Sequence, residues 1–216
     1  MIIISSWQPI HKFLVQHQVL IKNLFFVAYI LCFALISFGF YAFNNALELY
    51  LLVYSIAGTF GTASLYLFLL CLLPGIFQRF RVFTLPSVSI ILFRRQMGIL
   101  MYCIALLHSF YLSTIPGIMT QNLSIENFPI HSVLGMIALS LLFPVWITSN
   151  DFSQKKLGKF WKTVQRMTYI AMLAIFVHVA LVTTLSAILT AIVLVLELTS
   201  WLKVWFLKSQ QSRSVG

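Results

Sequence analysis

The sequence predicts an all-α membrane protein, a polytopic bundle of about six transmembrane helices with both termini in the cytoplasm. Hydrophobic residues make up 61% of the 216 residues and charged residues only 8%, which exceeds what a soluble core of this length requires. The apolar residues gather in stretches of about 20, the length that crosses a bilayer as a helix. All positive charges fall in segments that one topology places on a single side of the membrane.

Six apolar segments are long enough to span a membrane. They cover residues 22–43, 52–74, 96–115, 131–148, 166–184 and 186–206. Because the turn near Thr183 and Ser186 is very short, a five-helix alternative with one long final segment stays open. Two features favour six helices: about 40 apolar residues are too many for one crossing, and hydroxyl residues cluster where the turn would fall.

The transmembrane domain is expected to occupy residues 22–206, with a short segment on either side. Residues 1–21 carry Trp7 and Lys12 among apolar residues, which is typical of a segment that lies in the membrane interface. The first apolar stretch is too long, and starts too far along the chain, for an ordinary cleaved signal peptide, so we expect it to remain as an anchor. Residues 207–216 are expected to form a cytoplasmic tail.

The net charge of +10 has a topological explanation. With the N-terminus inside, the loops at 44–51, 116–130 and 184–186 face outward and contain no Lys or Arg, as the positive-inside rule requires. The fourteen basic residues all fall in inward-facing segments: Lys12, Lys22, Arg79, Arg81, Arg94, Arg95, Lys155, Lys156, Lys159, Lys162, Arg166, Lys203, Lys208 and Arg213. We therefore expect contact with anionic lipid at an inner (plasma) membrane and no binding of nucleic acid.

Several familiar site types are absent from the sequence. Neither GxGxxG nor GxxxxGK[ST] occurs, so no nucleotide site is predicted. Cys32, Cys71 and Cys103 fall one in each of the first three spans without metal-ligand spacing, and we expect them to be small buried residues. Gly58 and Gly61 in the second span indicate close helix packing.

Two histidines lie at membrane depth, where ionisable side chains are costly and are therefore functional candidates. His108 lies thirteen residues after Arg95, and His178 lies twelve residues after Arg166. At a rise of about 1.5 Å per residue, they lie roughly 20 Å and 18 Å from the inner boundary. Both spans run outward in this topology, so the two imidazoles are expected at nearly the same depth, somewhat toward the outer leaflet.

Two neutral imidazoles on facing helices at matched depth are the arrangement that a bis-histidine haem needs, because each supplies one axial nitrogen to the iron. Small residues beside them, Gly98 and Ala105 near His108 and Ala171 and Ala174 near His178, would leave room for a porphyrin. The alternative is that each histidine donates a hydrogen bond across the bundle to a hydroxyl or carbonyl group.

A third histidine, His131, lies at the outer entrance of the fourth span, directly after Phe128-Pro129-Ile130. It could meet a haem propionate, bind a quinol or cap the helix as a polar residue. A quinone headgroup commonly needs a hydrogen-bond donor near the interface, but one histidine does not define such a site.

A series of motifs runs through the second half of the chain. It consists of Arg94-Arg95-x-x-Gly98 leading to His108, then Gly135, Thr148-Ser149-Asn150-Asp151, Leu157-Gly158-x-x-Trp161, Gln165-Arg166-x-x-Tyr169 and His178. These motifs resemble the ferric reductase-like transmembrane family, with a core at about 94–184, and within it the haem-binding membrane subunits of the periplasmic methionine-sulfoxide reductase system. The resemblance implies a b-type cytochrome in which His108 and His178 ligate haem b.

One position departs from the family pattern. Members usually carry a histidine before the fifth helix as a ligand of a second, inner haem, whereas this chain has Gln165. Glutamine is a poor iron ligand, and Arg95, thirteen residues before His108, is also unsuited. The sequence therefore predicts one haem.

The resemblance also implies electron transfer from a quinol, or from a separate cytoplasmic flavin reductase, to an outer acceptor or partner oxidoreductase. The sequence includes no flavin and nicotinamide domain such as the longer members carry, so we expect a separate donor, or a quinone or flavin at the cytoplasmic side. This oxidoreductase subunit would have no catalytic nucleotide-binding domain of its own. The alternative is a non-redox bundle of the same ancestry that serves as an assembly partner or a transporter component.

Overall fold

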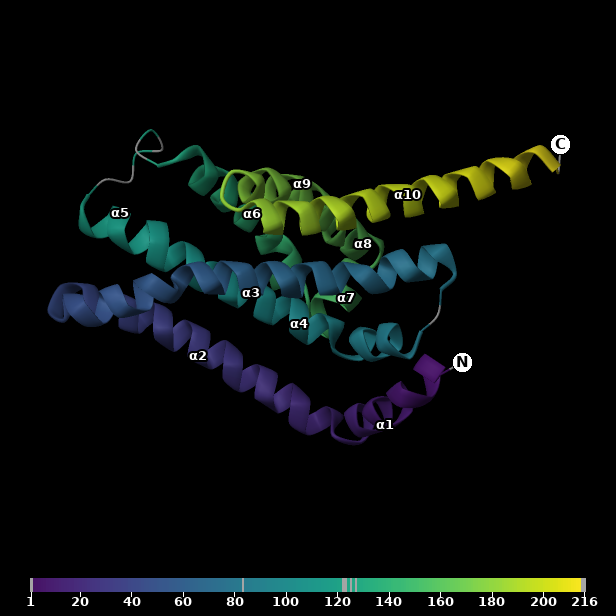
Figure 1. Ribbon diagram of the computed structural model, residues 1–216, viewed down its shortest axis with the longest axis horizontal. Helices are drawn as coiled ribbons and strands as arrows, with labels where there is room; N and C mark the ends of the chain where they lie inside the picture. The colour runs from purple at the N-terminus through teal and green to yellow at the C-terminus, as the bar shows by residue number, and fades with distance from the viewer. Residues whose placement is uncertain (1, 83, 122–123, 125, 127, 215–216) are drawn as a thin grey trace.

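The computed structural model describes residues 2–82, 84–121, 124, 126 and 128–214, and all regular elements in these residues are helices (Figure 1). In chain order they are α1 (Ile2–Gln16), α2 (Gln18–Asn45), α3 (Leu47–Phe80), α4 (Leu85–Ser109), the π-helix η1 (Phe110–Thr114), α5 (Ile115–Met119), α6 (Ile130–Ile147), α7 (Asp151–Leu157), α8 (Lys159–Gln165), α9 (Met167–Ala180) and α10 (Thr184–Ser214). The prediction of an all-α protein is confirmed.

Each predicted span corresponds to a helix that is long and apolar enough to cross a membrane, which confirms six spans among the described residues. They cover Gln18–Asn45, Leu47–Phe80, Leu85–Met119, Ile130–Ile147, Lys159–Ala180 and Thr184–Gln211. Because α9 ends at Ala180 and α10 begins at Thr184, the five-helix alternative is excluded. The chain is therefore a multi-pass membrane protein.

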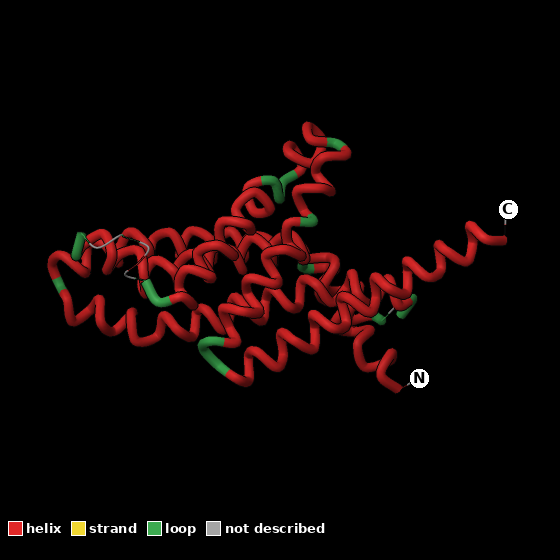
Figure 2. The backbone as a smooth tube through the Cα atoms, turned by 90° about the horizontal axis from the view of Figure 1, so that it is seen from above, coloured by secondary structure: helices red, strands yellow, loops and turns green. Residues whose placement is uncertain are grey.

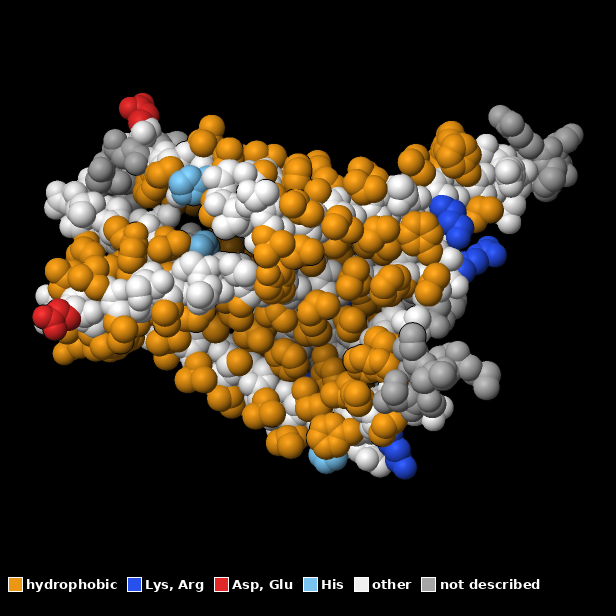
Figure 3. Space-filling model, viewed as in Figure 1, with side chains coloured by type: hydrophobic (Ala, Val, Ile, Leu, Met, Phe, Trp, Pro, Cys, Tyr) orange, Lys and Arg blue, Asp and Glu red, His pale blue; other side chains and the backbone are white. Residues whose placement is uncertain are grey.

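The bundle has two chemically different ends. Lys and Arg side chains gather at the end where both termini lie, which we call the basic end (Figures 1 and 3). The opposite end, which we call the acidic end, holds the turn between α2 and α3, the segment from α5 to α6, and the turn between α9 and α10. A belt of exposed hydrophobic side chains separates the ends (Figure 3), as a lipid-facing surface requires. That the basic end faces the cytoplasm stays a prediction.

The spanning helices form two layers. In the first layer, α2, α3 and α4 pack on one another, and in the second, α6, α9 and α10 do so through α9 (Figures 1 and 2). Contacts of α3 with α10 and of α4 with α6 join the layers. Phe68, Leu72, Tyr102, Leu142 and Met172 belong to the buried core between them.

Local sequence explains where α4 begins and how it ends. The Thr84 hydroxyl accepts a hydrogen bond from the Ser87 backbone N–H at 3.4 Å, and Pro86 fits the first turn because no intrahelical donor is needed there. Directly after His108 and Ser109, the helix widens into the π-helix η1. Tyr50 donates a hydrogen bond to the Tyr111 carbonyl at 2.7 Å and so satisfies a backbone acceptor in this irregular turn.

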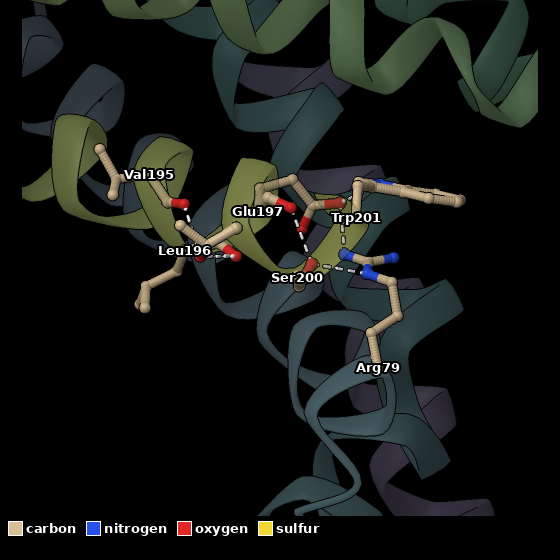
Figure 4. A network of polar contacts seen from close by, with 7 residues as sticks. Arg79, Val195, Leu196, Glu197, Ser200 and Trp201 are labelled. Atoms are coloured by element: carbon tan, nitrogen blue, oxygen red, sulfur yellow. Dashed lines mark hydrogen bonds and ion pairs between the residues drawn. The ribbon is translucent and has the colours of Figure 1, made fainter. Parts of the chain in front are cut away.

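A buried ion pair ties α10 to α3 near the basic end (Figure 4). Arg79 donates to the Glu197 carboxylate and, from Nε, to the Ser200 hydroxyl at 2.7 Å. Trp201 donates from Nε1 to the same carboxylate at 3.0 Å, and its ring lies 4.7 Å from the Arg79 guanidinium carbon. The side chains of Arg79 and Glu197 are only 15% and 5% exposed, so each charge depends on the other for compensation.

Replacing Glu197 by glutamine should lower the free energy of unfolding by about 3 kcal/mol, because the Arg79 charge stays buried without a counter-charge. Denaturant-induced unfolding of the purified chain in detergent measures this loss. Glu48→Gln is the matched control, since Glu48 is exposed in the first turn of α3. Equal stabilities of the two variants would contradict a stabilising role for the ion pair.

Candidate functional site

A cavity of about 690 Å³ lies between the two layers, in the half of the bundle nearer the acidic end. Its walls come from α3, α4, α6, α9 and the start of α10, and they include His108, His131 and His178. We call it the histidine cavity. Figure 3 shows a hollow in this half of the molecule, with histidine surface in and beside it.

His108 is fixed on α4 by a contact with α3. Its Nδ1 lies 2.8 Å from the Ala57 carbonyl oxygen. Because a carbonyl can only accept, Nδ1 carries the proton and Nε2 keeps a free lone pair. Gly61, one turn after Ala57, lies against the imidazole: a Cβ there would be 2.7 Å from Cε1 and 3.0 Å from Nε2. Only glycine leaves room for the ring in this position.

His178 on α9 is held in the same way by α6. Its Nδ1 donates to the His131 carbonyl at 2.6 Å, so its Nε2 also keeps the lone pair. Gly135, one turn after His131, lies beside the ring, and a Cβ there would be 3.1 Å from Cε1 and from Nδ1. A helix carbonyl followed four residues later by a glycine therefore positions both imidazoles.

The structure brings the three predicted site histidines together. His108 and His178 line one cavity, and the His131 ring centroid lies 6.3 Å from that of His178. The other two histidines lie elsewhere: His11 contacts the Ser89 hydroxyl at 3.0 Å, and His17 stacks on the Phe13 ring. Among the described residues, no group of three or more His, Cys, Asp or Glu could hold a metal ion.

The residues that surround the imidazoles differ partly from the prediction. Ala105 lines the cavity as expected, but Gly98, Ala171 and Ala174 do not. Ala171 is instead fully buried in the hydrophobic core. Gly61, which the sequence indicated as a helix-packing residue, lets α3 approach α4 closely at the His108 ring. The Ala57 carbonyl has no signal in the sequence, since any backbone carbonyl could play its part.

A second cavity of about 480 Å³ lies nearer the basic end, and we call it the basic-end cavity. Arg94, Arg95, Lys162 and Arg166 line it, together with Gln165 and aromatic residues, and no described lining residue is a histidine. Three buried side chains line both cavities and separate them: Phe68, Met101 and Leu142.

Gln165 lies in the wall of the basic-end cavity, where its amide group is used for structure. Its Nε2 donates to the Val145 carbonyl and to the Thr148 hydroxyl, both at 3.3 Å. Trp161 donates to the Thr148 carbonyl at 3.0 Å, so the same end of α6 anchors both side chains. These contacts hold α8 against α6.

An exposed ion pair borders the basic-end cavity. Arg95 donates to the Asp151 carboxylate at 2.7 Å and to the Gln154 side-chain oxygen at 3.2 Å. The hydrogen bond from Arg95, and then its positive charge, lower the pKa of the Asp151 carboxyl. Arg95 therefore connects α4 with α7 at the edge of this cavity.

The chain is similar to a family of membrane proteins and to several individual relatives. Residues 60–177 match the family described as "Ferric reductase like transmembrane component". This stretch contains His108, all of α6 and most of α9, and it ends one residue before His178. Over 100 residues the chain is 32% identical to the protein-methionine-sulfoxide reductase heme-binding subunit MsrQ of Brucella ovis, and equally similar to those of Brucella canis and Brucella suis.

The aligned stretch covers 44% of this chain and 44% of each relative, so less than half of each relative is matched. No solved structure matches the chain. The family match covers more than half of the chain. The six spans of the chain agree with a family of transmembrane proteins. The chain belongs to the ferric reductase-like transmembrane family.

Proposed function

We propose that this multi-pass inner-membrane protein is an electron-transfer subunit of the b-type cytochrome kind, with one haem held between His108 and His178. The observation that carries the proposal is the pair of imidazoles that line one cavity with Nδ1 bound to a backbone carbonyl. In both residues Nε2 is then the nitrogen with a free lone pair, which is the form that ligates iron.

The cavity fits such a group in size and in chemistry. A volume of about 690 Å³ lies within the range of cofactor sites, and its part nearer the basic end is lined by apolar residues such as Leu65 and Ile175. Gly61 and Gly135 let each ring lie close to the neighbouring helix, and the hydrogen bonds to the Ala57 and His131 carbonyls orient both imidazoles before a ligand binds. The relatives with 32% identity are named heme-binding subunits, which supports the same cofactor here.

The protein's own part is to bind, orient and protect the cofactor. Haem, when bound, would supply an iron centre that gains and loses one electron. The Ala57 and His131 carbonyls fix the orientation of the axial ligands and increase their basicity. Phe68, Met101 and Leu142 close the cavity toward the basic end and keep that side dry.

The basic-end cavity is proposed as the donor side. A quinol or flavin bound there, or a cytoplasmic flavin reductase docked at its rim, would face the histidine cavity across the shared wall of Phe68, Met101 and Leu142. Arg94, Arg95 and Lys162 provide positive charge for an acidic donor. At the acidic end, His131 lies where electrons would leave for an outer acceptor or a partner oxidoreductase.

The purified, reduced protein should show a sharp haem absorbance band that disappears in His108→Ala and in His178→Ala, because each variant loses one axial ligand. His17→Ala is the control, since His17 lies in the exposed break between α1 and α2. A folded, colourless wild-type protein would overturn the proposal and favour a non-redox bundle.

One haem per chain is expected, because Gln165 and Arg95 cannot replace the imidazoles of a second site. The ratio of extracted haem to protein measures this number. Gln165→Ala should leave the ratio unchanged, whereas two haems in the wild type would show that the basic-end cavity has other iron ligands.

Gly61→Ala should reduce haem content at least tenfold, because the new Cβ would lie 2.7 Å from the His108 ring and displace it. Gly58→Ala is the matched control: Gly58 lines the same cavity on the same helix, and a Cβ there meets nothing within 4 Å. Equal haem content in the two variants would refute the positioning role of Gly61.

A further inference from the structure

The histidine cavity is amphipathic, and some of the hydroxyl groups that line it make no hydrogen bond to a described residue. Nine Ser and Thr residues line it: Ser55, Thr59, Thr62, Ser64, Ser109, Ser113, Ser132, Thr183 and Ser186. The four on α3 donate to carbonyls of their own helix, at 2.6 Å for Ser55 and for Thr59, 3.4 Å for Thr62 and 2.9 Å for Ser64. Such hydroxyls are already satisfied.

The other five hydroxyls bond to no described residue, and we call them the hydroxyl rim: Ser109, Ser113, Ser132, Thr183 and Ser186. They come from α4, η1, α6, the turn before α10, and α10. Ser186 is only 8% exposed, so its hydroxyl has little access to solvent other than through the cavity. Hydroxyls that open into a cavity are available to donate to a ligand that accepts hydrogen bonds.

The rim lies on one side of the histidines. Ser113 follows His108 along the direction in which α4 and η1 run to the acidic end, and Thr183 follows His178 in the same direction. Ser132 and Ser186 lie near the starts of α6 and α10, at that same end. The part of the cavity toward the basic end is instead apolar, with Leu65, Phe68, Met101, Leu139, Leu142 and Ile175.

No Lys or Arg is among the described residues that line the cavity. A negatively charged group at the rim would therefore depend on donors other than Lys and Arg: the hydroxyls, which can each provide one hydrogen bond, and His131, which lines the cavity at the same end. Hydrogen bonds to a charged acceptor are stronger than those between neutral groups. The rim suits a carboxylate, while the apolar part suits the hydrocarbon edge of the same ligand.

We propose that the hydroxyl rim binds the two carboxylates of the haem and so orients it, with the carboxylate edge toward the acidic end and the apolar edge against Phe68 and Leu142. This inference rests on the proposed haem site. It adds a positioning role for Ser132, Thr183 and Ser186, none of which ligates iron.

The test is the rate of haem release from the purified holoprotein to excess apomyoglobin, followed by absorbance. Ser132→Ala/Thr183→Val/Ser186→Ala should release haem about tenfold faster than the wild type, because charge-assisted hydrogen bonds are lost. Ser55→Ala/Thr59→Val is the matched control and should release haem at the wild-type rate, since these hydroxyls bond to their own helix.

A second comparison uses haem dimethyl ester, in which both carboxylates are methylated. Loaded into the full-length chain, it should leave the wild type and the rim variant at the same rate, because the rim has no carboxylate to bind. This comparison also separates a local effect from a folding defect, which would speed the release of both ligands. Equal release of haem and ester from the wild type, or a rim variant that loses both faster, would overturn the inference but not the haem site. A wild type that takes up neither ligand would overturn both.

Discussion

Everything at the site depends on a hydrogen bond from an imidazole Nδ1 to a carbonyl of the neighbouring helix in the same layer. In lipid, a side-chain donor without a partner is costly, so this bond stabilises the contact between helices as well as the ring. The carbonyls of Ala57 and His131 meet this need, and the glycines one turn later let each ring approach its helix. The bundle is thus held together by the same contacts that prepare the Nε2 atoms for a ligand.

The two cavities differ in the side chains that line them. Both lie between the same layers and share a wall, but only one contains imidazoles. In the other, Gln165 donates to α6 and Arg95 binds the segment after α6, so the side chains at the expected ligand positions have structural partners. Both side chains therefore have hydrogen-bond partners without any ligand in the cavity.

Much of the fold could be predicted from the sequence because lipid imposes simple rules. The six spans follow from apolar length, and the joint placement of His108 and His178 follows from counting residues from Arg95 and Arg166. Which face of a helix meets its neighbour does not follow from such counting. Gly58 and Gly61 differ by three positions, and only the packing of α3 on α4 decides which of them contacts the imidazole. The expectation for Ala171 was wrong for the same reason, since the rotation of α9 turns that residue into the core.

The buried Glu197 has a consequence for how the protein is made. A lone carboxylate in a membrane helix raises the cost of transferring that helix from the translocon into lipid by up to about 3 kcal/mol. Arg79 is synthesised more than a hundred residues earlier, so its charge is already in place when α10 emerges from the ribosome. Insertion of α10 is therefore coupled to the presence of α3. A chain in which α3 is misplaced would retain α10 in the bilayer less stably, because Glu197 would lack its counter-charge.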